Sequence, residues 1–511
     1  MRLKQLGTRS HFQIRILNTD WSFYFPIRCQ LPLEFLDRCT TVCTPSVTMG
    51  CTPASISCLV SLISNAASTL ETYYTANSTK PYVPSLDDTE PHPLDNEIYP
   101  LDIRQAAQTL EGACAQLCAT LVRPNHTILN KHLDVYQNAY LSVVLRAQIA
   151  DILLDEPAGL PVSEISKRCS ISEKKLARVL RTLCSQHIFR EGTSIQVVAV
   201  ELVVNDLISL ERYHGLARKS CSSHSSDEPT NKAAAHLADT LLDPEWGQSD
   251  APERAPFNRA FGVPIPIWHY FEGNNDPKAA EQGARFGKAM VAWNATLDSH
   301  AIITAYPWDK LRDGAVVNDV GGGRGNISME LYKRYPNLNL KLQDLPERTE
   351  QTQRESWPKE CPQVIADGRI EFKSVDLFVE SPIANCDIYL LKNVIHLMPD
   401  KAATTALSNV RKVMSPTSRV LVQDYIMQGG VRVPDDGRTL KQAQPPLLPN
   451  YGVGRIRQYR TDAAMMVLCN SQERTLDDFI QLGKAVGLEF VKVWDLGEIG
   501  AVEFAPGNFE K

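Results

Sequence analysis

The sequence predicts an α/β fold over its second half, built on a mostly parallel sheet, with a helical domain of winged-helix shape before it. Three observations support this prediction. From residue 315 onward, short β-rich runs alternate with helical runs, which is typical of parallel strands joined by crossover helices. Residues 138–213 combine helices, turns and a hairpin signal. The 511 residues are enough for two or three domains.

The composition excludes several classes of protein. With 43% hydrophobic and 22% charged residues, the chain is typical of a globular protein, not of a disordered or fibrous one. Its net charge of −6 argues against a nucleic-acid partner. The 13 cysteines form no CxxC pair, so we expect reduced thiols, a cytoplasmic location and no metal site. No apolar run reaches the roughly 18 residues that span a membrane, so no membrane partner is expected.

Residues 1–60 are interpreted as an N-terminal extension of uncertain role. Their basic start has no clean apolar segment of the secretory type, whereas a mitochondrial transit peptide stays open. A second methionine, Met49, begins the run MGCTPAS, but Ala54 stands where a myristoylation signal needs Ser or Thr. Residues 1–48 are therefore either part of the mature protein or a translated extension without a folded role.

The helical domain begins with amphipathic patterns. Apolar residues at three- and four-residue steps predict a helix over 101–121, and an apolar-rich helix is expected over 140–154. Ser163 and Ser172 are predicted to cap two further helices, followed by two short strands about a turn at 191–192. This order of helix, helix and hairpin predicts the winged-helix shape.

The domain assigned to residues 61–250 also contains a polar, Ser-rich stretch at 218–233, which is expected to be a surface loop. Residues 251–294 return to helical and aromatic content and are predicted to be connecting helices. By residue type alone, such a cluster of Phe, Trp and Tyr is more typical of a core than of a ligand site.

The sharpest local signal is the run VNDVGGGRGN at residues 317–326, where a buried strand leads through glycines into a helix. Glycines let a ligand approach the backbone, and the start of a helix offers free N–H groups. A dinucleotide fingerprint would need one more glycine, but Asn326 or Ser328 stands there, so a Rossmann dehydrogenase is not indicated. A tight turn without a ligand is the structural alternative.

Acidic residues end the next two predicted strands. Asp344 can accept hydrogen bonds from ribose hydroxyls, or can cap a helix. Asp376, beside Leu377 and Phe378, can hold an adenine, or can belong to an ordinary turn.

The fourth and fifth strands carry residues of acid–base chemistry. The fourth ends in KNVIH at His396, the fifth ends at Asp424, and Glu473 follows later in the chain. Functional groups in open α/β sheets gather at the carboxyl ends of the strands. An imidazole with carboxylates beside it has the parts of a general base.

Six segments occur in order along the chain: VNDVGGGRGN, LQDLPE, SVDLF, LLKNVIHLMPD, VLVQDYIM and CNSQERTLDDF. Together they resemble the plant-type and fungal small-molecule O-methyltransferases that use S-adenosylmethionine, such as the caffeic acid and flavonoid enzymes. The resemblance covers about residues 135–511, and KKLARVLRTLCSQHIF resembles that family's winged-helix dimerisation domain. It implies a Rossmann-like, seven-stranded methyltransferase domain over 295–511, connecting helices over 251–294 that line an acceptor pocket, and a homodimer.

The resemblance also implies a role for each matching residue. The residues implied to bind S-adenosylmethionine are Asp319, Gly321, Gly323, Asp344, Leu345, Asp376, Leu377 and Lys392. The catalytic set is His396 as general base with Asp424 and Glu473 as flanking acids. The residues implied to line the acceptor pocket are Phe286, Met290, Met465 and Asn470.

The predicted reaction is methyl transfer to a hydroxyl, phenolic by expectation, of a small aromatic metabolite. Two departures from the family pattern bear on it: Leu397 and Met398 replace the Asp-Trp that usually follows the base, and the loop at 428–458 is longer than in the plant enzymes. The alternatives are a catalytically degenerate homologue that binds cofactor or metabolite, a winged-helix DNA-binding regulator, and N-methylation. The regulator would use the basic helix face of residues 174–181.

Overall fold

The computed structural model describes residues 56–85, 92–154, 156, 159–191, 197–200, 227–273, 276–296, 299–434 and 439–507. The predicted extension over 1–60 lies outside the described residues up to residue 55, as does the stretch 218–226 of the predicted Ser-rich loop. The rest of that loop is helix α9 (Asp227–Ala234), so the loop prediction is wrong there. Acidic residues at its start and alanines at its end suit a helix.

The first helices confirm the amphipathic pattern in part. The elements are α1 (Ile56–Thr75), the 3₁₀ turn η2 (Pro93–Asn96), α2 (Leu101–Leu121), α3 (Pro124–Arg146) and α4 (Ile149–Leu154). Helix α2 has the predicted bounds. The single helix predicted over 140–154 is wrong, because the chain breaks at Ala147 and Gln148, where Gln148 has a left-handed φ of 52°.

Two short helices then pack against a small sheet. The elements are β1 (Leu160–Pro161), α5 (Val162–Cys169), α6 (Glu173–Cys184), β2 (Phe189–Glu191) and β3 (Val197–Val200). The three strands form an antiparallel sheet in the order β1-β3-β2. Ser172 immediately precedes α6, but no capping bond from its side chain is found. Ser163 is not a cap, because α5 already begins at Val162 after Pro161.

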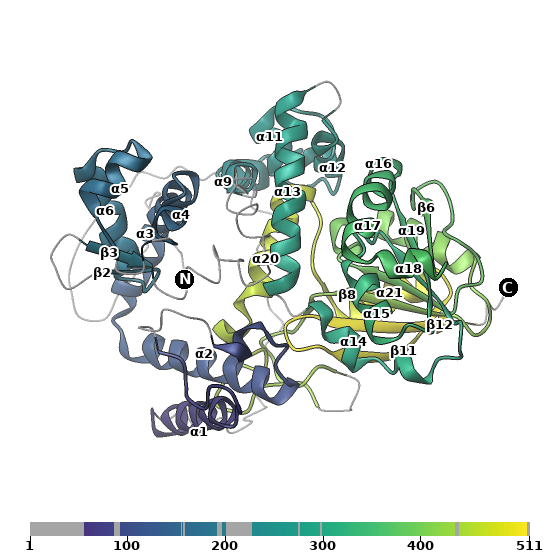
Figure 1. Ribbon diagram of the computed structural model, residues 1–511, viewed down its shortest axis with the longest axis horizontal. Helices are drawn as coiled ribbons and strands as arrows, with labels where there is room; N and C mark the ends of the chain where they lie inside the picture. The colour runs from purple at the N-terminus through teal and green to yellow at the C-terminus, as the bar shows by residue number, and fades with distance from the viewer. Residues whose placement is uncertain are drawn as a thin grey trace, which may run out of the picture. The chain divides into compact units, whose positions relative to one another are not determined.

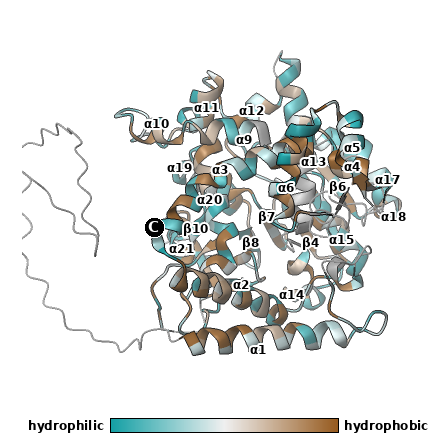
Figure 2. Ribbon diagram, turned by 90° about the vertical axis from the view of Figure 1, so that its left-hand side faces the viewer, coloured by the Kyte–Doolittle hydropathy of each residue, from teal (hydrophilic) through white to brown (hydrophobic). Residues whose placement is uncertain are grey.

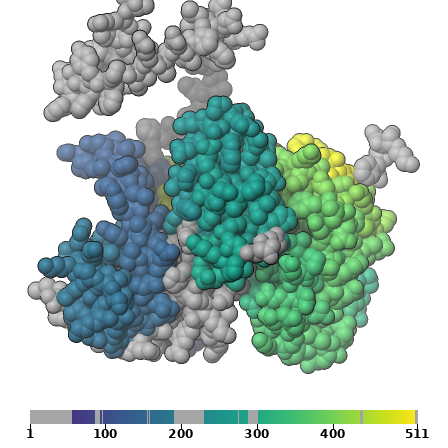
Figure 3. All heavy atoms as spheres, turned by 90° about the horizontal axis from the view of Figure 1, so that it is seen from above, coloured from purple at the N-terminus to yellow at the C-terminus, as the bar shows by residue number. Residues whose placement is uncertain are grey.

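Further helices follow, and α9 is among those that contact the later α20 (Ile456–Cys469). The further helices are α9, α10 (Leu237–Leu241), η4 (Pro252–Arg254), α11 (Pro256–Phe261), α12 (Ile267–Phe271), α13 (Pro277–Thr296), η5 (Ser299–Ala301), α14 (Ile302–Ala305) and η6 (Trp308–Lys310). The Phe257 and Phe261 rings stack at 4.7 Å between centroids, and Phe257 is fully buried. The aromatic residues of α11 and α12 therefore form a core, which includes residues 467–469 of α20. Figure 3 shows these helices, in teal, adjoining the green C-terminal part.

The C-terminal half contains the predicted seven-stranded sheet, in the order β11-β12-β8-β7-β4-β5-β6. Its strands are β4 (Val316–Val320), β5 (Asn339–Asp344), β6 (Ile370–Ser374), β7 (Ile388–Lys392), β8 (Arg419–Asp424), β11 (Leu488–Asp495) and β12 (Gly500–Pro506). The neighbours from β8 to β6 are parallel, whereas β12 is antiparallel to both β8 and β11. The carboxyl ends of β4 to β8 therefore lie at one edge.

Helices cover both faces of this sheet (Figure 1). They are α15 (Asn326–Arg334), α16 (Pro346–Gln351), the π-helical turn η7 (Thr352–Ser356), α17 (Trp357–Glu360), α18 (Pro362–Ala366), α19 (Asp400–Lys412) and α21 (Leu476–Ala485). Alternate residues of β7 point to opposite faces: Leu390 packs in the core under α15, and Leu391 in the core under α19 and α21. A strand buried on both faces explains the continuous apolar run in its sequence.

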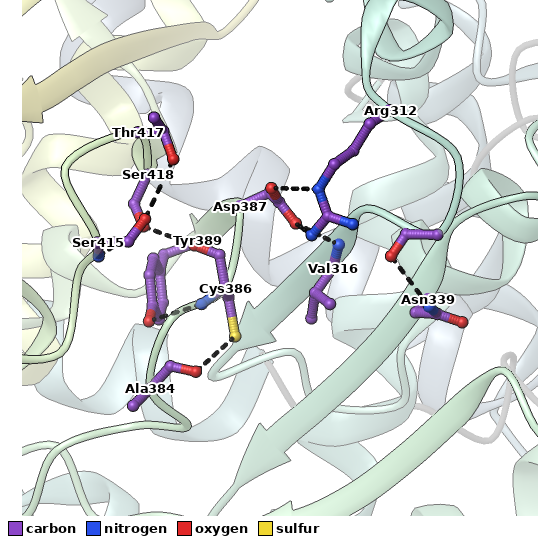
Figure 4. A network of polar contacts seen from close by, with 11 residues as sticks. Arg312, Val316, Asn339, Ala384, Cys386, Asp387, Tyr389, Ser415, Thr417 and Ser418 are labelled. Atoms are coloured by element: carbon purple, nitrogen blue, oxygen red, sulfur yellow. Dashed lines mark hydrogen bonds and ion pairs between the residues drawn. The ribbon is translucent and has the colours of Figure 1, made fainter.

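The edge opposite the carboxyl ends is held by side-chain hydrogen bonds (Figure 4). Asp387, just before β7, accepts bonds from the Val316 N–H at 2.8 Å and from Arg312 Nη2 at 2.7 Å. The Ser418 hydroxyl donates to the carbonyl of Cys386 at 2.6 Å. These bonds fix where β4, β7 and β8 begin, and so where their other ends emerge.

The long loop after β8 packs against helices α1 and α2. It contains the short strand β9 (Ile426–Met427) and η9 (Gly452–Arg455), and leads into α20. Leu59 of α1 and Ala113 of α2 share a small core with Leu447 and Tyr451 of the loop. Figure 2 shows the hydrophobic first half of α1. None of the described helices combines the length and hydrophobicity that a bilayer crossing requires.

Candidate active site

The glycine turn follows β4 and leads into α15. Gly321 has a φ of 72°, and a Cβ added to it would lie 2.6 Å from Val394 Cγ2. Gly323 has a φ of 58°, but a Cβ there would meet no atom within 4 Å. Both residues use the backbone freedom of glycine. The space over Gly323 is open, so a ligand can approach the backbone there.

Two carboxyl groups lie beside this turn. Asp344, at the end of β5, accepts bonds from the Gly323 N–H at 2.7 Å and from the Leu345 N–H at 2.8 Å. Asp319, within β4, accepts a bond from the Ser328 hydroxyl at 2.7 Å. Burial raises the pKa of Asp319 to about 6 and also raises the pKa of Asp344. The structure thus brings Asp319, Asp344 and the glycine turn together, as predicted from the sequence.

The turn after β6 places Asp376 and Leu377 at the same edge. Asp376 Oδ1 accepts a bond from the Phe378 N–H at 2.9 Å. Leu377 is buried, and its carbonyl accepts a bond from Asn409 at 2.8 Å. The side chain of Asp376 thus has the geometry of an ordinary turn, which is the structural alternative, and its role in binding stays a prediction.

His396 lies on η8 (Ile395–Leu397), just past β7, and is buried. Its Nδ1 lies 2.7 Å from Glu473 Oε1. Glu473 reaches this place because β10 (Arg474–Thr475) pairs in parallel with β9, directly after Asp424. A two-residue strand pair therefore joins segments that are far apart in the sequence.

Burial and nearby charges shift the pKa values of the site residues in opposite directions. Burial acts to lower the pKa of His396, but Glu473 and Asp424 outweigh it, so that the pKa is raised. Burial raises the pKa of Asp424 to about 7, and no hydrogen bond of good geometry reaches either of its carboxyl oxygens from the described chain. Burial lowers the pKa of Lys392 to about 8, against the attraction of Asp319 and Asp424. Lys392 therefore interacts with both the glycine turn and the His396 group.

The residues expected to line an acceptor pocket are less clearly assembled. The Phe286 ring lies 4.9 Å from the Phe271 ring, and the side chain of Met290 lies outside the described residues. Met465 is buried, and its carbonyl accepts a bond from the Ser471 N–H at 3.2 Å. Asn470 donates to the carbonyls of residues 249 and 251 at 2.5 and 3.0 Å. Their role in a pocket stays a prediction.

Three residues that the motifs did not single out hold the His396 group in place. Asp462 Oδ1 accepts a bond from the Glu473 N–H at 2.8 Å. The Ser471 hydroxyl donates to the His396 carbonyl at 2.7 Å, and Arg474 donates to the carbonyls on either side of His396. Ser471 and Arg474 lie close to Glu473 in the segment CNSQERTLDDF, and that proximity is the sequence signal for them.

Comparisons with known proteins agree with this geometry. Residues 235–489 match the family model of the O-methyltransferase domain. The chain is 36% identical over 457 residues to "3-O-methyltransferase 2" of Phanerochaete chrysosporium, covering 88% of this chain and 98% of the relative. Human N-acetylserotonin methyltransferase, solved with S-adenosylmethionine, has 18% identity and a TM-score of 0.58, covering 76% of this chain and 99% of its own. The structure of OxaC with S-adenosylhomocysteine and oxaline has 21% identity and a TM-score of 0.60, covering 88% and 98%. The two structures share the fold.

Proposed function

This chain belongs to the O-methyltransferase family, and from that membership we propose that it transfers the methyl group of S-adenosylmethionine to a phenolic hydroxyl of a small metabolite, with His396 as general base. As a family member it is an enzyme that methylates hydroxyl groups of small molecules. The observation that carries the finer proposal is the buried His396–Glu473 pair, at 2.7 Å, on the sheet edge that also holds the glycine turn.

The residues of the glycine turn fit S-adenosylmethionine. The open space above Gly323 admits a ligand against the backbone. Each oxygen of Asp344 accepts one backbone bond and keeps a lone pair for a ribose hydroxyl. The residues proposed to hold the cofactor are Asp319, Gly321, Gly323, Asp344, Leu345, Asp376, Leu377 and Lys392. When bound, this cofactor supplies an activated methyl group on its sulfonium.

His396 is suited to take the acceptor's proton. Since Nδ1 faces Glu473, the ring carries its proton on Nδ1 and leaves the lone pair of Nε2 free. A phenol has a pKa of about 10 and is mostly protonated at neutral pH. As the acceptor oxygen took the methyl group that the cofactor's sulfonium releases, its O–H bond would break and the proton would pass to Nε2 of His396. The Glu473 carboxylate then stabilises the imidazolium, and general base work of this kind contributes about 10²–10⁴-fold.

The surroundings of the base favour an apolar, aromatic acceptor. Leu397 packs against the aromatic core of α11 and α12, so an apolar side chain directly follows the base. We propose that Phe286, Met290 and Met465 line the acceptor pocket. Asn470 would shape it by fixing residues 249–251 through its side-chain amide.

A homodimer through the N-terminal domain is proposed as well. Helix α3 exposes a series of large apolar residues, namely Ile128, Leu129, Leu133, Val135 and Tyr136. Exposed apolar residues grouped in this way are typical of an interface. The two helices and three strands of residues 160–200 support the winged-helix assignment. Light scattering of the purified protein will give the mass of a dimer if this is correct.

The function is tested with labelled S-adenosylmethionine and a panel of phenols, with products analysed by mass for the gain of one CH₂. We expect methylated phenols from the native protein and loss of most turnover in His396→Gln, with cofactor affinity kept. Unchanged turnover in His396→Gln would remove the base role. Cofactor binding without any product would favour the degenerate homologue, methylated amines alone would favour N-methylation, and salt-dependent binding to duplex DNA would favour the regulator.

A further inference from the structure

Arg474 is a buried cation next to the proposed base. Its side chain has no exposed surface, and it directly follows Glu473 in the chain. Nη1 donates to the Ile395 carbonyl at 2.9 Å, and Nη2 donates to the Met398 carbonyl at 2.6 Å. Nε and Nη2 also donate to Asp400 Oδ1, at 3.1 and 2.8 Å. All four bonds end on residues 395–400, the segment that carries His396.

This segment has little structure of its own. The turn η8 is only three residues long, and it is closed by two bonds, from the Leu397 N–H to Val394 at 3.2 Å and from the Met398 N–H to Ile395 at 3.1 Å. Short 3₁₀ turns have poor hydrogen-bond geometry and do not fix a side chain firmly. A guanidinium presents donors in a rigid planar fork, which can hold two carbonyls and a carboxylate at once.

The same short stretch of chain also holds the imidazole ring. Glu473 contacts Nδ1 of His396 at 2.7 Å, and the Ser471 hydroxyl donates to the His396 carbonyl at 2.7 Å. Since successive side chains in extended chain point to opposite sides, Glu473 can reach the ring while Arg474 reaches the backbone. Ring and backbone of His396 are therefore fixed by adjacent residues of one segment.

We propose that Arg474 is a positioning residue for methyl transfer, which holds the backbone on both sides of His396 so that Nδ1 stays on Glu473 and Nε2 faces the acceptor. The inference rests on the proposed role of His396 as base. Arg474 reacts with neither substrate, and it acts only through the placement of the ring. A displacement of about 1 Å in a reacting group can lower the rate about 100-fold.

The test compares Arg474→Gln and Arg474→Lys with Arg411→Gln. Arg411 is a matched control, because it also donates to two backbone carbonyls, those of Gly487 at 2.9 Å and Gly507 at 3.1 Å, far along the chain from His396. We expect kcat to fall about 100-fold in Arg474→Gln and more than about 10-fold in Arg474→Lys. The Kd for S-adenosylmethionine should stay within about twofold. Arg411→Gln should lower Tm and leave kcat unchanged.

Arg474→Lys separates geometry from charge, since it keeps the cation and loses the fork. In this variant the ring moves away from Glu473, so the acidic limb of the pH profile of kcat/KM should shift to lower pH. Native kcat and an unshifted limb in Arg474→Lys would overturn the inference. If Arg474→Gln does not fold, Ser471→Ala is used instead, since it removes only the bond from the Ser471 hydroxyl to the His396 carbonyl. A native kcat in both Ser471→Ala and Arg474→Lys would also overturn the inference.

A double-mutant cycle with His396→Gln shows whether Arg474 acts through the ring. If it does, the double variant has the same residual turnover as His396→Gln alone. Losses that multiply in the double variant would overturn the inference while leaving the base role intact. Native turnover in His396→Gln would instead overturn the proposed function, so the two failures are distinguishable.

Discussion

At the scale of single residues, the chemistry of His396 depends on charges that oppose its burial. A buried imidazole alone would have a lowered pKa, but Glu473 and Asp424 outweigh this and raise it. The raised pKa has two opposite effects on a general base. It stabilises the proton once transferred, and it protonates the ring before reaction when the pH falls. The enzyme should therefore lose kcat/KM on the acidic side of neutrality.

The first prediction concerns that pH profile. In the native enzyme the acidic limb of kcat/KM should lie above about pH 6.5, the ordinary pKa of histidine. Glu473→Gln removes the largest charge that raises the His396 pKa, so the limb should move to lower pH while kcat also falls. The measurement is kcat/KM over the range of pH in which the protein stays folded. A limb that does not move would mean that another group controls it.

The second prediction concerns Asp462, which accepts the Glu473 N–H at 2.8 Å. Asp462→Asn keeps an acceptor oxygen there and should stay near native activity. Asp462→Ala removes it and should lower kcat about 10-fold, which corresponds to about 1.4 kcal/mol. Steady-state kinetics of the two variants check this. Equal activity in both would show that Glu473 is held without Asp462.

Some residues of the site could be predicted from the sequence, and others could not. His396, Asp424, Asp319 and Asp344 lie at or near the carboxyl ends of parallel strands, so their meeting at one edge could be predicted. Asp462, Ser471 and Arg474 act through backbone atoms of other segments. Such contacts depend on how helix α20 and β10 pack. Ser471 and Arg474 lie in the segment CNSQERTLDDF, but the sequence does not indicate which backbone atoms they contact.

Among the elements of the fold, the glycine turn after β4 contains two glycines that are required for different reasons. Gly321 needs both a left-handed φ and the absence of a Cβ, whereas Gly323 needs only the φ and borders open space. The first glycine therefore serves packing against Val394, and we expect the second to serve the approach of the cofactor.

The third prediction follows from this difference. Gly323→Ala should weaken binding of S-adenosylmethionine more than tenfold, because the new methyl group enters the open space over the turn. The left-handed φ of residue 323 is strained for alanine, so the free energy of unfolding should also fall by about 1–2 kcal/mol. Gly368→Ala is the matched control, since Gly368 has a φ of 64° and no atom within 4 Å of an added Cβ, at a turn outside the site. Thermal unfolding should show equal losses of stability in the two variants. Isothermal titration should show weaker binding of S-adenosylmethionine in Gly323→Ala alone. Equal binding in both variants would argue against a cofactor at Gly323.

The elements themselves were predictable where the periodicity was strong. Helix α2 has the predicted bounds, and strands alternate with helices from residue 315 onward as the pattern indicates, because their apolar residues face continuous cores. The break at Gln148 was missed, since a left-handed φ there has no glycine to signal it. The predicted start of α5 is two residues too late, because Pro161, and not Ser163, precedes the first helical turn.

Over the larger part of the molecule, helices α1 and α2 contact the loop between β8 and α20. Gln108 of α2 donates to the Gly497 carbonyl at 3.4 Å and accepts from Arg455 at 3.2 Å. A Cβ on Gly454 would lie 2.0 Å from the Gln108 carbonyl oxygen, so α2 and η9 meet backbone to backbone. Helix α20, which carries Asp462, begins directly after Arg455.

The fourth prediction is that Gly454→Ala separates α2 from η9. Overpacking of this kind should lower stability by about 1–3 kcal/mol, and kcat should fall as well, because α20 loses the support of its first turn. Gly430→Ala, in the same loop but with no atom within 4 Å of the new Cβ, is the control and should be neutral. Thermal unfolding and steady-state kinetics of the two variants test this. A stable Gly454→Ala variant with native kcat would show that α2 is not coupled to the site.

The pairing of β9 with β10 has a consequence for how this enzyme can diversify. Two residues on each side fix Glu473 beside Asp424, while most of the chain between them forms the long loop and α20. The entropic cost of closing a loop rises slowly with its length, because each doubling of the length costs only about 0.6 kcal/mol. If His396 is the base as proposed, we expect that a change in the length of this loop leaves the alignment of His396, Glu473 and Asp424 intact.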